Sequence, residues 1–289
     1  MFAIELEFLK YLETLRTEFL NTFFQAVTIL GEEVLLIFLV VTLWFVVNKK
    51  LAQRMLFITL TSLSINGIIK NIARVPRPFT KGISCVREDT ATGYSFPSGH
   101  TQGFTTWSTV SAIQFRKIWL QLLVGILSVL VGFSRMYLGA HYPSDVLVAM
   151  VLVISIAYLG NKLYDKVEDP KKLYLGTVLL LSPFFVYFLF EPESLFADAY
   201  KTYGMLCGLM VVSFLDERVE GLSYDIPLWK KILRVVIGVV FAFALKEGIK
   251  VLNVFDTVSM SLIFDAVRYF VVVFAVGFLC PLVFKKINL

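Results

Sequence analysis

The stretch GEEVLLIFLVVTLWFVVNK, residues 31–49, decides the fold class of this chain of 289 residues. No charged residue interrupts it between Val34 and Val47. A helix needs about 20 mainly apolar residues to cross the hydrocarbon core of a bilayer. Further apolar runs lie at residues 51–69, 101–115, 118–138, 144–161, 173–190, 198–215, 231–252 and 262–284. We therefore expect an all-α polytopic membrane protein.

The overall composition agrees with this class and disfavours others. Hydrophobic residues make up 57% of the chain, and 27 residues are phenylalanine. Soluble domains contain fewer apolar residues. The net charge of +5 is not gathered into the basic face that a nucleic-acid-binding domain requires. Three cysteines, Cys85, Cys207 and Cys280, give neither a metal-ligand spacing nor a disulfide framework.

Basic residues alternate between the apolar runs. They follow the first, third, fifth and seventh runs and the last one, as Lys49, Lys50, Arg54, Arg116, Lys117, Lys162, Lys166, Lys171, Lys172, Arg218, Lys230, Lys231, Arg234, Lys285 and Lys286. By the positive-inside rule these segments are cytoplasmic. Residues 70–100 and 135–145 are then expected on the opposite, exoplasmic face.

The first 30 residues differ from the rest of the chain. Apolar residues recur at helical spacing but charged residues lie between them, as in Phe8, Leu12, Leu15, Phe19 and Phe23 with Glu5, Glu7, Lys10, Glu13, Arg16 and Glu18. So many charges disfavour a spanning helix, and the stretch lacks the basic start and unbroken apolar core of a signal peptide. We expect an amphipathic interfacial segment over 1–30, a membrane core over 31–165 and additional transmembrane helices over 166–289.

The stretch KNIARVPRP, residues 70–78, is the first that suggests chemistry. Lys70 ends an apolar run, and Pro76 and Pro78 force Arg77 into an extended, stiff segment. A guanidinium that is already fixed loses less entropy when it binds an oxyanion. Lys70 alone could equally be a positive residue at a helix end.

The stretch YSFPSGHTQGF, residues 94–104, predicts a helix start, because proline and small residues precede an apolar run. Unpaired amides at a helix start bind phosphate, and Gly99 permits close approach. Ser98 could add a hydroxyl donor, and His100 would lie in the first turn. The alternative makes Ser98 an ordinary N-cap and His100 a residue that fills the interface.

The third stretch, SRMYLGAHYPSD, spans residues 134–145 and contains Arg135, His141 and Asp145. A carboxylate four residues after a histidine can accept its ring N–H and leave the other nitrogen free to attack. Because only His141 has such a partner, local chemistry favours it over His100 as the nucleophile. Asp145 could instead cap the helix that begins near Pro143.

These three stretches all fall on the same predicted side of the membrane. Together they supply the parts that phosphoryl transfer needs: cations and helix amides for the oxygens, a nucleophile with a carboxylate, and a separate acid. No carboxylate cluster is available to hold magnesium. We therefore expect neither a metal nor another cofactor.

The three stretches resemble the tripartite signature of the type 2 phosphatidic acid phosphatase (PAP2) family. The first motif matches at Lys70 and, after six residues, Arg77 and Pro78; the second at Pro97, Ser98, Gly99 and His100; the third at Ser134, Arg135, His141 and Asp145. The resemblance covers only residues 70–145 directly. It implies a PAP2-like helical core, to which the C-terminal helices are an addition.

The resemblance also implies a metal-independent phosphatase with a phosphohistidine intermediate. His141 would attack phosphorus, Asp145 would orient its ring, and His100 would protonate the leaving oxygen and later activate water. The phosphate would be bound by Lys70, Arg77, Ser98, Gly99 and Arg135.

A site at the membrane boundary suits a lipid phosphate or diphosphate whose tail stays in the bilayer. Polyprenyl diphosphate, phosphatidic acid, phosphatidylglycerol phosphate and a sphingoid phosphate all qualify, and we favour polyprenyl diphosphate in a bacterial plasma membrane. Two other readings are a lipid-binding or lipid-transporting protein with a relic or auxiliary phosphatase site, and a vanadate-dependent haloperoxidase-like enzyme. Three roles remain possible for the C-terminal helices: extra packing, a homodimer surface, or movement of lipid between leaflets.

Overall fold

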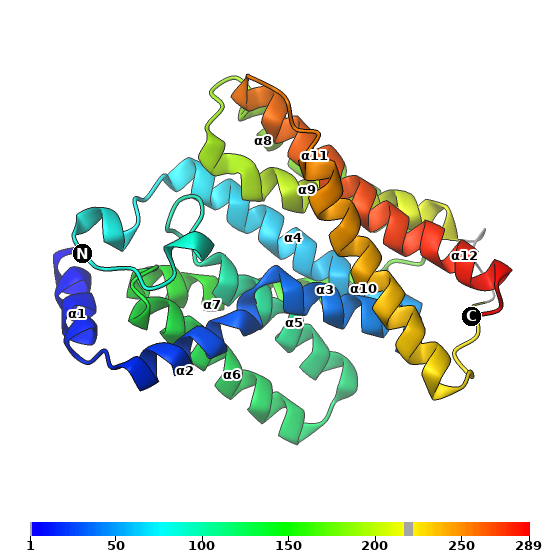
Figure 1. Cartoon of the computed structure of the whole chain (residues 1–289), viewed down its shortest axis with the longest axis horizontal. Coiled ribbons are helices and arrows are strands. Elements are labelled where there is room, and N and C mark those ends of the chain that lie inside the picture. Colours follow the sequence, from blue (N-terminus) through cyan, green and yellow to red (C-terminus); the bar gives the residue numbers. More distant parts are fainter. Residues whose placement is uncertain (1, 217–221) are drawn as a thin grey trace. The chain divides into compact units, whose positions relative to one another are not determined.

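The computed structural model describes residues 2–216 and 222–289, and these residues form helices and turns without a β-strand (Figure 1). The expected all-α polytopic fold is confirmed. Arg218, one of the cations assigned to the cytoplasmic side, lies outside the described residues. The chain divides into two compact units, Met1–Leu36 with Ile65–Lys162, and Ile37–Ser64 with Leu163–Leu289.

The first unit contains α1 (Phe2–Thr14), α2 (Glu18–Thr28), the 3-10 turn η1 (Ile29–Gly31), α5 (Gly99–Phe115), α6 (Ile118–Tyr137) and most of α7 (Pro143–Lys166). It also contains the end of α4 (Lys49–Ala73) and the turns η3 (Pro78–Lys81) and η4 (Glu88–Thr90). A Cβ at Gly132 of α6 would lie 2.6 Å from a methyl carbon of Val146. Glycine therefore lets α6 and α7 approach closely.

The N-terminal segment is not one helix over its amphipathic stretch. It breaks between α1 and α2, where the Thr17 hydroxyl accepts a hydrogen bond from the Leu20 amide at 3.2 Å and caps α2. Beyond η1 the chain enters α3 (Glu33–Thr42). A π-helical turn, η2 (Leu43–Val47), extends α3.

The side of α1 that packs on the protein is formed by Leu9 and Leu12, which are buried against Ile83 and Tyr142. Ile4, Phe8 and Tyr11 form a second apolar face on the same helix, and they are exposed. The helix thus has an apolar face toward the protein and another away from it.

All nine apolar runs lie on helices. By length and composition, four helical segments of the described residues could cross a membrane: Lys49–Lys81, Ile118–Tyr137, Pro143–Lys166 and Val258–Lys286. The bent pair Glu18–Gly31 and Glu33–Val47 would make a fifth if it forms one span. The protein is therefore an integral membrane protein.

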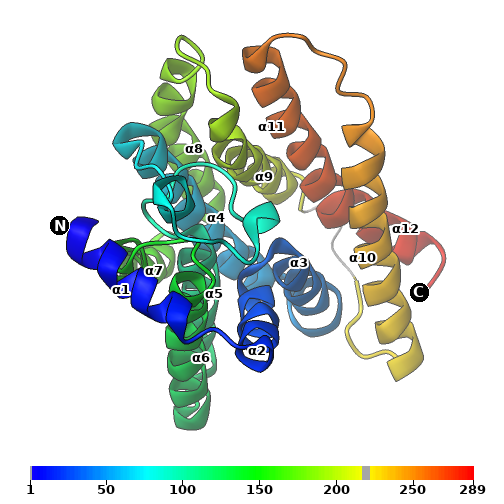
Figure 2. The same ribbon diagram turned by 60° about the vertical axis from the view of Figure 1, so that its left-hand side comes forward.

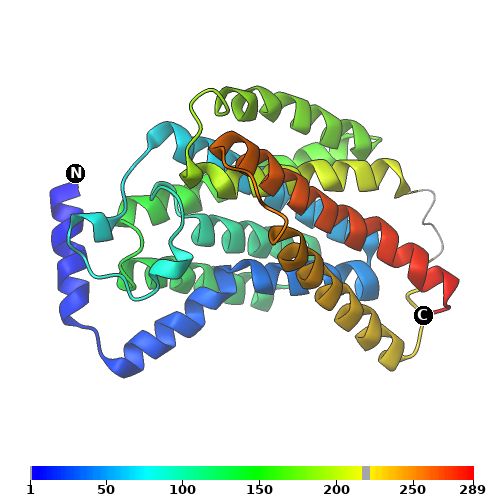
Figure 3. The ribbon, with the colours of Figure 1, turned by 45° about the horizontal axis from the view of Figure 1, so that its top comes forward.

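The second unit contains α8 (Pro170–Tyr187), α9 (Ala197–Phe214), α10 (Leu228–Lys250), α11 (Val258–Phe274), the π-helical η7 (Ala275–Leu279) and α12 (Cys280–Lys286). Helices α9 and α11 pack side by side (Figures 2 and 3). A Cβ at Gly204 would lie 2.0 Å from the Ala266 carbonyl oxygen, and one at Gly208 would lie 2.8 Å from that of Phe270. Since both pairs advance by four residues, α9 and α11 run parallel.

Two ion pairs lie on this pair of helices. Lys201 contacts Asp198 at 2.9 Å on α9, and Arg268 contacts Asp265 at 2.8 Å on α11. On α10, Lys246 and Glu247 lie in the last two turns, before the helix ends at Lys250. Asp198 with Lys201 and Asp265 with Arg268 are therefore paired, as ionisable side chains in membrane segments usually are.

Candidate functional site

The first predicted motif runs from the end of α4 into η3. Lys70 lies in the last turn of α4. Arg77 precedes η3 with extended backbone angles, φ −75° and ψ 156°. The extended conformation that the two prolines predict for Arg77 is confirmed.

The second motif begins α5, whose first residue is Gly99. Ser98 occupies the N-cap position, but its hydroxyl does not cap the helix; it accepts a hydrogen bond from the Thr101 hydroxyl at 2.9 Å. The Ser98 amide donates to the main-chain oxygen of Asp145 at 3.1 Å. This bond joins the second motif to the third.

The third motif lies where α6 ends and α7 begins. Arg135 is in the last turn of α6, His141 in the connecting loop, and Asp145 in the first turn of α7. Gly139 of this loop has φ +80°, and a Cβ there would lie 2.2 Å from the Ser84 carbonyl oxygen. The loop that presents His141 therefore requires glycine at this position, for its backbone angles and for space.

The His141 ring lies between a carboxylate and a guanidinium. Its Nδ1 is 3.1 Å from Asp145 Oδ2, and its Nε2 is 3.1 Å from Arg77 Nη1. A guanidinium can only donate, so Nε2 accepts and the ring proton sits on Nδ1, where it is donated to Asp145. Burial lowers the pKa of His141 well below its usual value, and the nearby charges of Arg77 and Lys70 lower it further. The imidazole is thus neutral, with its lone pair on Nε2.

Asp145 is held by more than the imidazole. Its Oδ2 also accepts from the Tyr142 amide at 2.8 Å and from the Ser95 hydroxyl. Asp145 therefore accepts from the His141 ring, as a catalytic partner would, and also from the backbone just before α7, as a helix cap would. Ser95 was not identified from the sequence, although it lies two residues before the second motif; its hydroxyl is 3.5 Å from His141 Nδ1.

Backbone carbonyls fix the Arg77 guanidinium. It donates to Gly93 O at 2.9 Å, to Ala140 O at 3.0 Å and to Thr92 O, in addition to its contact with His141. These bonds span the loop before α5 and the loop before α7. Arg77 is consequently ordered at the nucleophile before any substrate binds.

Lys70 reaches the start of α5. Its Nζ donates to Tyr94 O at 2.5 Å and to Ser95 O at 3.4 Å. A Cβ at Gly99 would lie 4.0 Å from Lys70 Cε and 3.7 Å from Asn66 Oδ1. Asn66, which the sequence did not reveal, donates to the carbonyl oxygen of Pro97 at 3.3 Å and so supports the loop before the helix.

Arg135 is fully buried, with an exposed fraction of 0%. Its Nη1 donates to Thr28 Oγ1 at 2.9 Å and to Thr90 Oγ1 at 3.3 Å, whereas Nε and Nη2 contact no partner among the described residues. His100 Nε2 is likewise buried and unpaired within the described ranges. A Cβ at Gly31 would lie 3.0 Å from His100 Cβ, so η1 packs against this histidine. Buried polar atoms normally have partners, and these three are suited to an anion and its leaving group.

The structure therefore brings the predicted residues into one region of the first unit. Direct contacts connect Arg77, His141, Asp145 and Ser98, and Lys70 lies beside Gly99. Residues 2–216 and 222–289 contain no group of three His, Cys, Asp or Glu side chains that could hold a metal ion. The donors that converge here are cations, amides and hydroxyls, which suit an oxyanion.

Three named proteins are similar to part of this chain. Undecaprenyl-diphosphatase BcrC of Bacillus subtilis is 32% identical over 131 residues, 44% of this chain and 66% of the relative. Dolichyldiphosphatase of Saccharomyces cerevisiae is 31% identical over 132 residues, 42% and 54% of the two chains. Human sphingosine-1-phosphate phosphatase 2 is 27% identical over 173 residues, which are 56% of this chain and 43% of the relative. The matched part is thus less than two thirds of each relative.

Two family models match the chain, and together they span more than half of it. Residues 51–169 match the PAP2 superfamily, and residues 200–289 match the transmembrane extension of PAP2 superfamily phosphatases. The first match contains all three motifs. No solved structure matches. On the strength of these two matches, the chain belongs to the PAP2 superfamily, with a catalytic-type core followed by a transmembrane extension.

Proposed function

We propose that this protein is a membrane-embedded phosphatase that hydrolyses a lipid phosphate or diphosphate through a phosphohistidine. One observation supports it above the others: His141 lies between Asp145 and Arg77, which fixes a neutral ring with its lone pair on Nε2. The names of the relatives, two diphosphatases and a sphingosine-1-phosphate phosphatase, agree with this chemistry.

In the proposed reaction, the phosphate oxygens take the Arg77 donor away from Nε2, and Nε2 attacks phosphorus. The P–O bond to the leaving group breaks as the N–P bond forms. Asp145 stabilises the positive charge that develops on the ring of His141. Lys70, Arg77, Arg135, the Ser98 hydroxyl and the Gly99 amide bind the three equatorial oxygens.

His100 is proposed to deliver the proton to the leaving oxygen. The negative charge of a phosphate bound beside its ring favours the protonated form. After the leaving group departs, neutral His100 takes a proton from water, which attacks the phosphohistidine and restores His141. The unpaired Nε2 of His100 gives this group a free nitrogen for both steps.

We further propose polyprenyl diphosphate as the substrate and the exoplasmic side of a bacterial plasma membrane as the place of the site. The diphosphatase relatives support the first, and the alternation of basic segments supports the second. The division into an interfacial segment over 1–30, a catalytic core over 31–165 and an extension over 166–289 stays a prediction, as does a homodimer.

Phosphate release from purified protein in detergent tests the function. A panel of lipid phosphates and diphosphates would be assayed with EDTA, with wild type, His141→Ala and His100→Ala. We expect release that survives EDTA and is lost in both variants, because His141 forms the intermediate and His100 serves both its formation and its hydrolysis. Release that both variants retain, or that EDTA abolishes, would contradict the proposal.

A further inference from the structure

A fourth cation, Arg87, lies at the edge of the site and belongs to none of the three motifs. Its Nη2 is 3.2 Å from Glu32 Oε1, and its Nε is 3.2 Å from Asp89 Oδ1. The Arg87 side chain is 22% exposed and that of Glu32 is 21% exposed, in contrast to the fully buried Arg135. The pair therefore lies where the buried site meets the surface.

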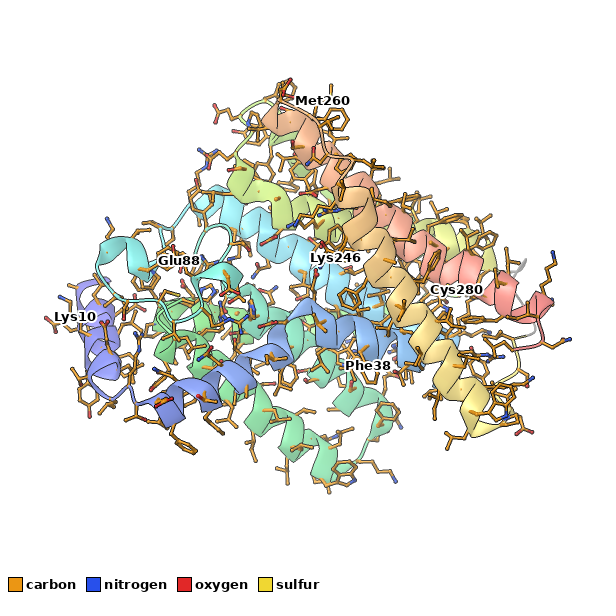
Figure 4. The ribbon with its side chains drawn as sticks, viewed as in Figure 1. Lys10, Phe38, Glu88, Lys246, Met260 and Cys280 are labelled. Atoms are coloured by element: carbon orange, nitrogen blue, oxygen red, sulfur yellow. The ribbon has the colours of Figure 1, made fainter. Side chains whose placement is uncertain are left out.

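Contacts place Arg87 next to the turn that holds Arg135. The Thr90 hydroxyl accepts from Arg135 Nη1 at 3.3 Å and donates to the carbonyl oxygen of Arg87 at 3.0 Å. Arg87 is the N-cap of η4 and Thr90 is its last residue; Glu88 of this turn is labelled in Figure 4. Thr90 thus connects a buried phosphate-binding cation to the more exposed one.

Glu32 places the other end of the pair next to His100. It directly follows Gly31, and a Cβ at Gly31 would lie 3.0 Å from His100 Cβ and from the His100 carbonyl oxygen. The Arg87–Glu32 pair therefore joins the turn against His100 to the turn against Arg135. These are the residues that face the leaving oxygen and the transferred phosphate in the proposed mechanism.

We propose that Arg87 binds the second, non-reacting phosphate of a diphosphate ester and makes the site selective for diphosphates over monophosphates. This inference rests on the proposed function. In a diphosphate, the leaving oxygen beside His100 belongs to another phosphate, whose negative charge has to lie close to that histidine. Lys70, Arg77 and Arg135 are already assigned to the transferred phosphate, so a further cation at this edge matches the additional charge.

The pairing with Glu32 is consistent with exchange of one anion for another. A guanidinium binds a phosphate as it binds a carboxylate, with paired donors in a planar fork. Glu32 contacts Arg87 through Nη2 alone, whereas Asp89 pairs with both Nε and Nη2 at 3.2 and 3.3 Å, so phosphate binding would replace Glu32 and leave the guanidinium paired. A monophosphate ester has an uncharged tail at this position and gains nothing from Arg87.

The test compares two substrates with the same tail, farnesyl diphosphate and farnesyl monophosphate, on the full chain in detergent. We expect Arg87→Gln to lower kcat/KM for the diphosphate about 10- to 100-fold more than for the monophosphate. Loss of one hydrogen bond to a charged group changes binding by about this factor. Glu32→Gln, which removes the competing carboxylate, should keep or raise the preference for diphosphate. Lys81 is an exposed cation of the same loop, and Lys81→Gln should leave kcat/KM unchanged for both the diphosphate and the monophosphate.

Other outcomes would contradict either the role of Arg87 or the phosphatase function, and the two cases can be told apart. Equal losses on both substrates in Arg87→Gln would overturn the inference and leave the phosphatase function in place. The same would follow if Glu32→Gln lost diphosphate activity as strongly as Arg87→Gln, because the pair would then act only as a structural link. Wild-type protein that hydrolyses neither compound nor any other lipid phosphate would instead overturn the proposed function itself.

Discussion

At the scale of single residues, Arg77 makes two loops depend on one side chain. Its donors contact Thr92 and Gly93 in the loop before α5, and Ala140 and His141 in the loop before α7. Any movement of either loop therefore changes the position of the guanidinium relative to the nucleophile. The extended backbone that Pro76 and Pro78 impose on Arg77 limits such movement from its own side.

The protonation of His141 leads to a prediction for stability. Its pKa in the folded protein lies well below the usual 6.5, chiefly because the ring is buried, while in the unfolded chain it titrates near 6.5. As pH falls below that value, the unfolded state gains a proton that the folded state does not, so folding weakens. The contribution lost by pH 5.5 is on the order of 1 kcal/mol.

The check is thermal unfolding in detergent at pH 7.5 and pH 5.5. Wild type should lose more stability between these values than His141→Gln, whose side chain does not titrate. His100 and the carboxylates are present in both proteins, so the difference between them isolates His141. Equal losses would mean that His141 titrates alike in the folded and unfolded states.

Sequence motifs identified the charged residues of the candidate site but not the neutral ones that hold them. Ser95, Asn66, Thr28 and Thr90 bond Asp145, Pro97 and Arg135 from elements far apart along the chain. Serine, threonine and asparagine are common at turns and helix ends, and nothing in their spacing distinguishes these four. Their role depends on tertiary contacts that a linear pattern does not contain.

At the scale of elements, α1 and the break that follows it brace the loop that carries His141. Arg16 Nε and Nη2 donate to the Tyr137 carbonyl oxygen at 3.0 and 2.8 Å, and Nη1 donates to Ser84 O at 3.0 Å. The Glu5 carboxylate accepts from the Ser144 amide at 2.8 Å at the start of α7. The N-terminal segment thus satisfies backbone groups at both ends of the nucleophile loop.

We therefore expect Arg16→Ala to lower kcat roughly 10-fold or more, with a smaller change in KM, because small displacements of a nucleophile reduce rate strongly. Steady-state kinetics on a lipid diphosphate measure this. Lys10→Ala, an exposed cation on α1, is the matched control and should behave as wild type. An unchanged kcat in Arg16→Ala would show that the loop holds its geometry without this clamp.

The contact between α9 and α11 gives a second prediction at this scale. The Cβ in Gly204→Ala would lie 2.0 Å from the Ala266 carbonyl oxygen, so the two backbones must separate. We expect this substitution to destabilise the protein by about 1–3 kcal/mol, as overpacking does. Gly176→Ala in α8 has no atom within 4 Å of the new Cβ and should be neutral or slightly stabilising.

Thermal unfolding of the two variants in the same detergent separates these effects. Similar transition temperatures would mean that α9 and α11 can move apart at little cost. The apolar runs predicted where the described helices of this extension lie, with α11, η7 and α12 in one run, but they did not predict which pair packs closely. That information lies in glycines four residues apart, whose partner is set only by the folded arrangement.

At the scale of the whole molecule, the parallel direction of α9 and α11 agrees with the alternation of basic segments. One helix, α10, lies between them in sequence, so the alternating basic segments predict that α9 and α11 end on the same side, as two parallel helices do. The direction of each helix relative to the cell is a separate matter. It depends on the charge asymmetry of the loops, which predicts that the motif-bearing segments are exoplasmic.

Labelling of Cys85 with a membrane-impermeant maleimide tests that orientation. Cys85 lies in the loop before α5, near Arg135 and Arg77, and burial raises the pKa of its thiol. Its reaction should therefore be slow at neutral pH and faster near pH 8.5, where more thiolate is present. With Cys207 and Cys280 replaced by alanine, we expect labelling of intact cells from outside.

A cysteine placed at Lys166, in a Cys85→Ala background with the same two replacements, is the control for the opposite side. Lys166 ends α7, one of the segments assigned to the cytoplasm, so this cysteine should react only after the cells are permeabilised. Cys85 that also reacts only in permeabilised cells would place the site in the cytoplasm. The substrate would then have to present its phosphate to the inner leaflet, while the chemistry proposed for His141 and His100 would be unaffected.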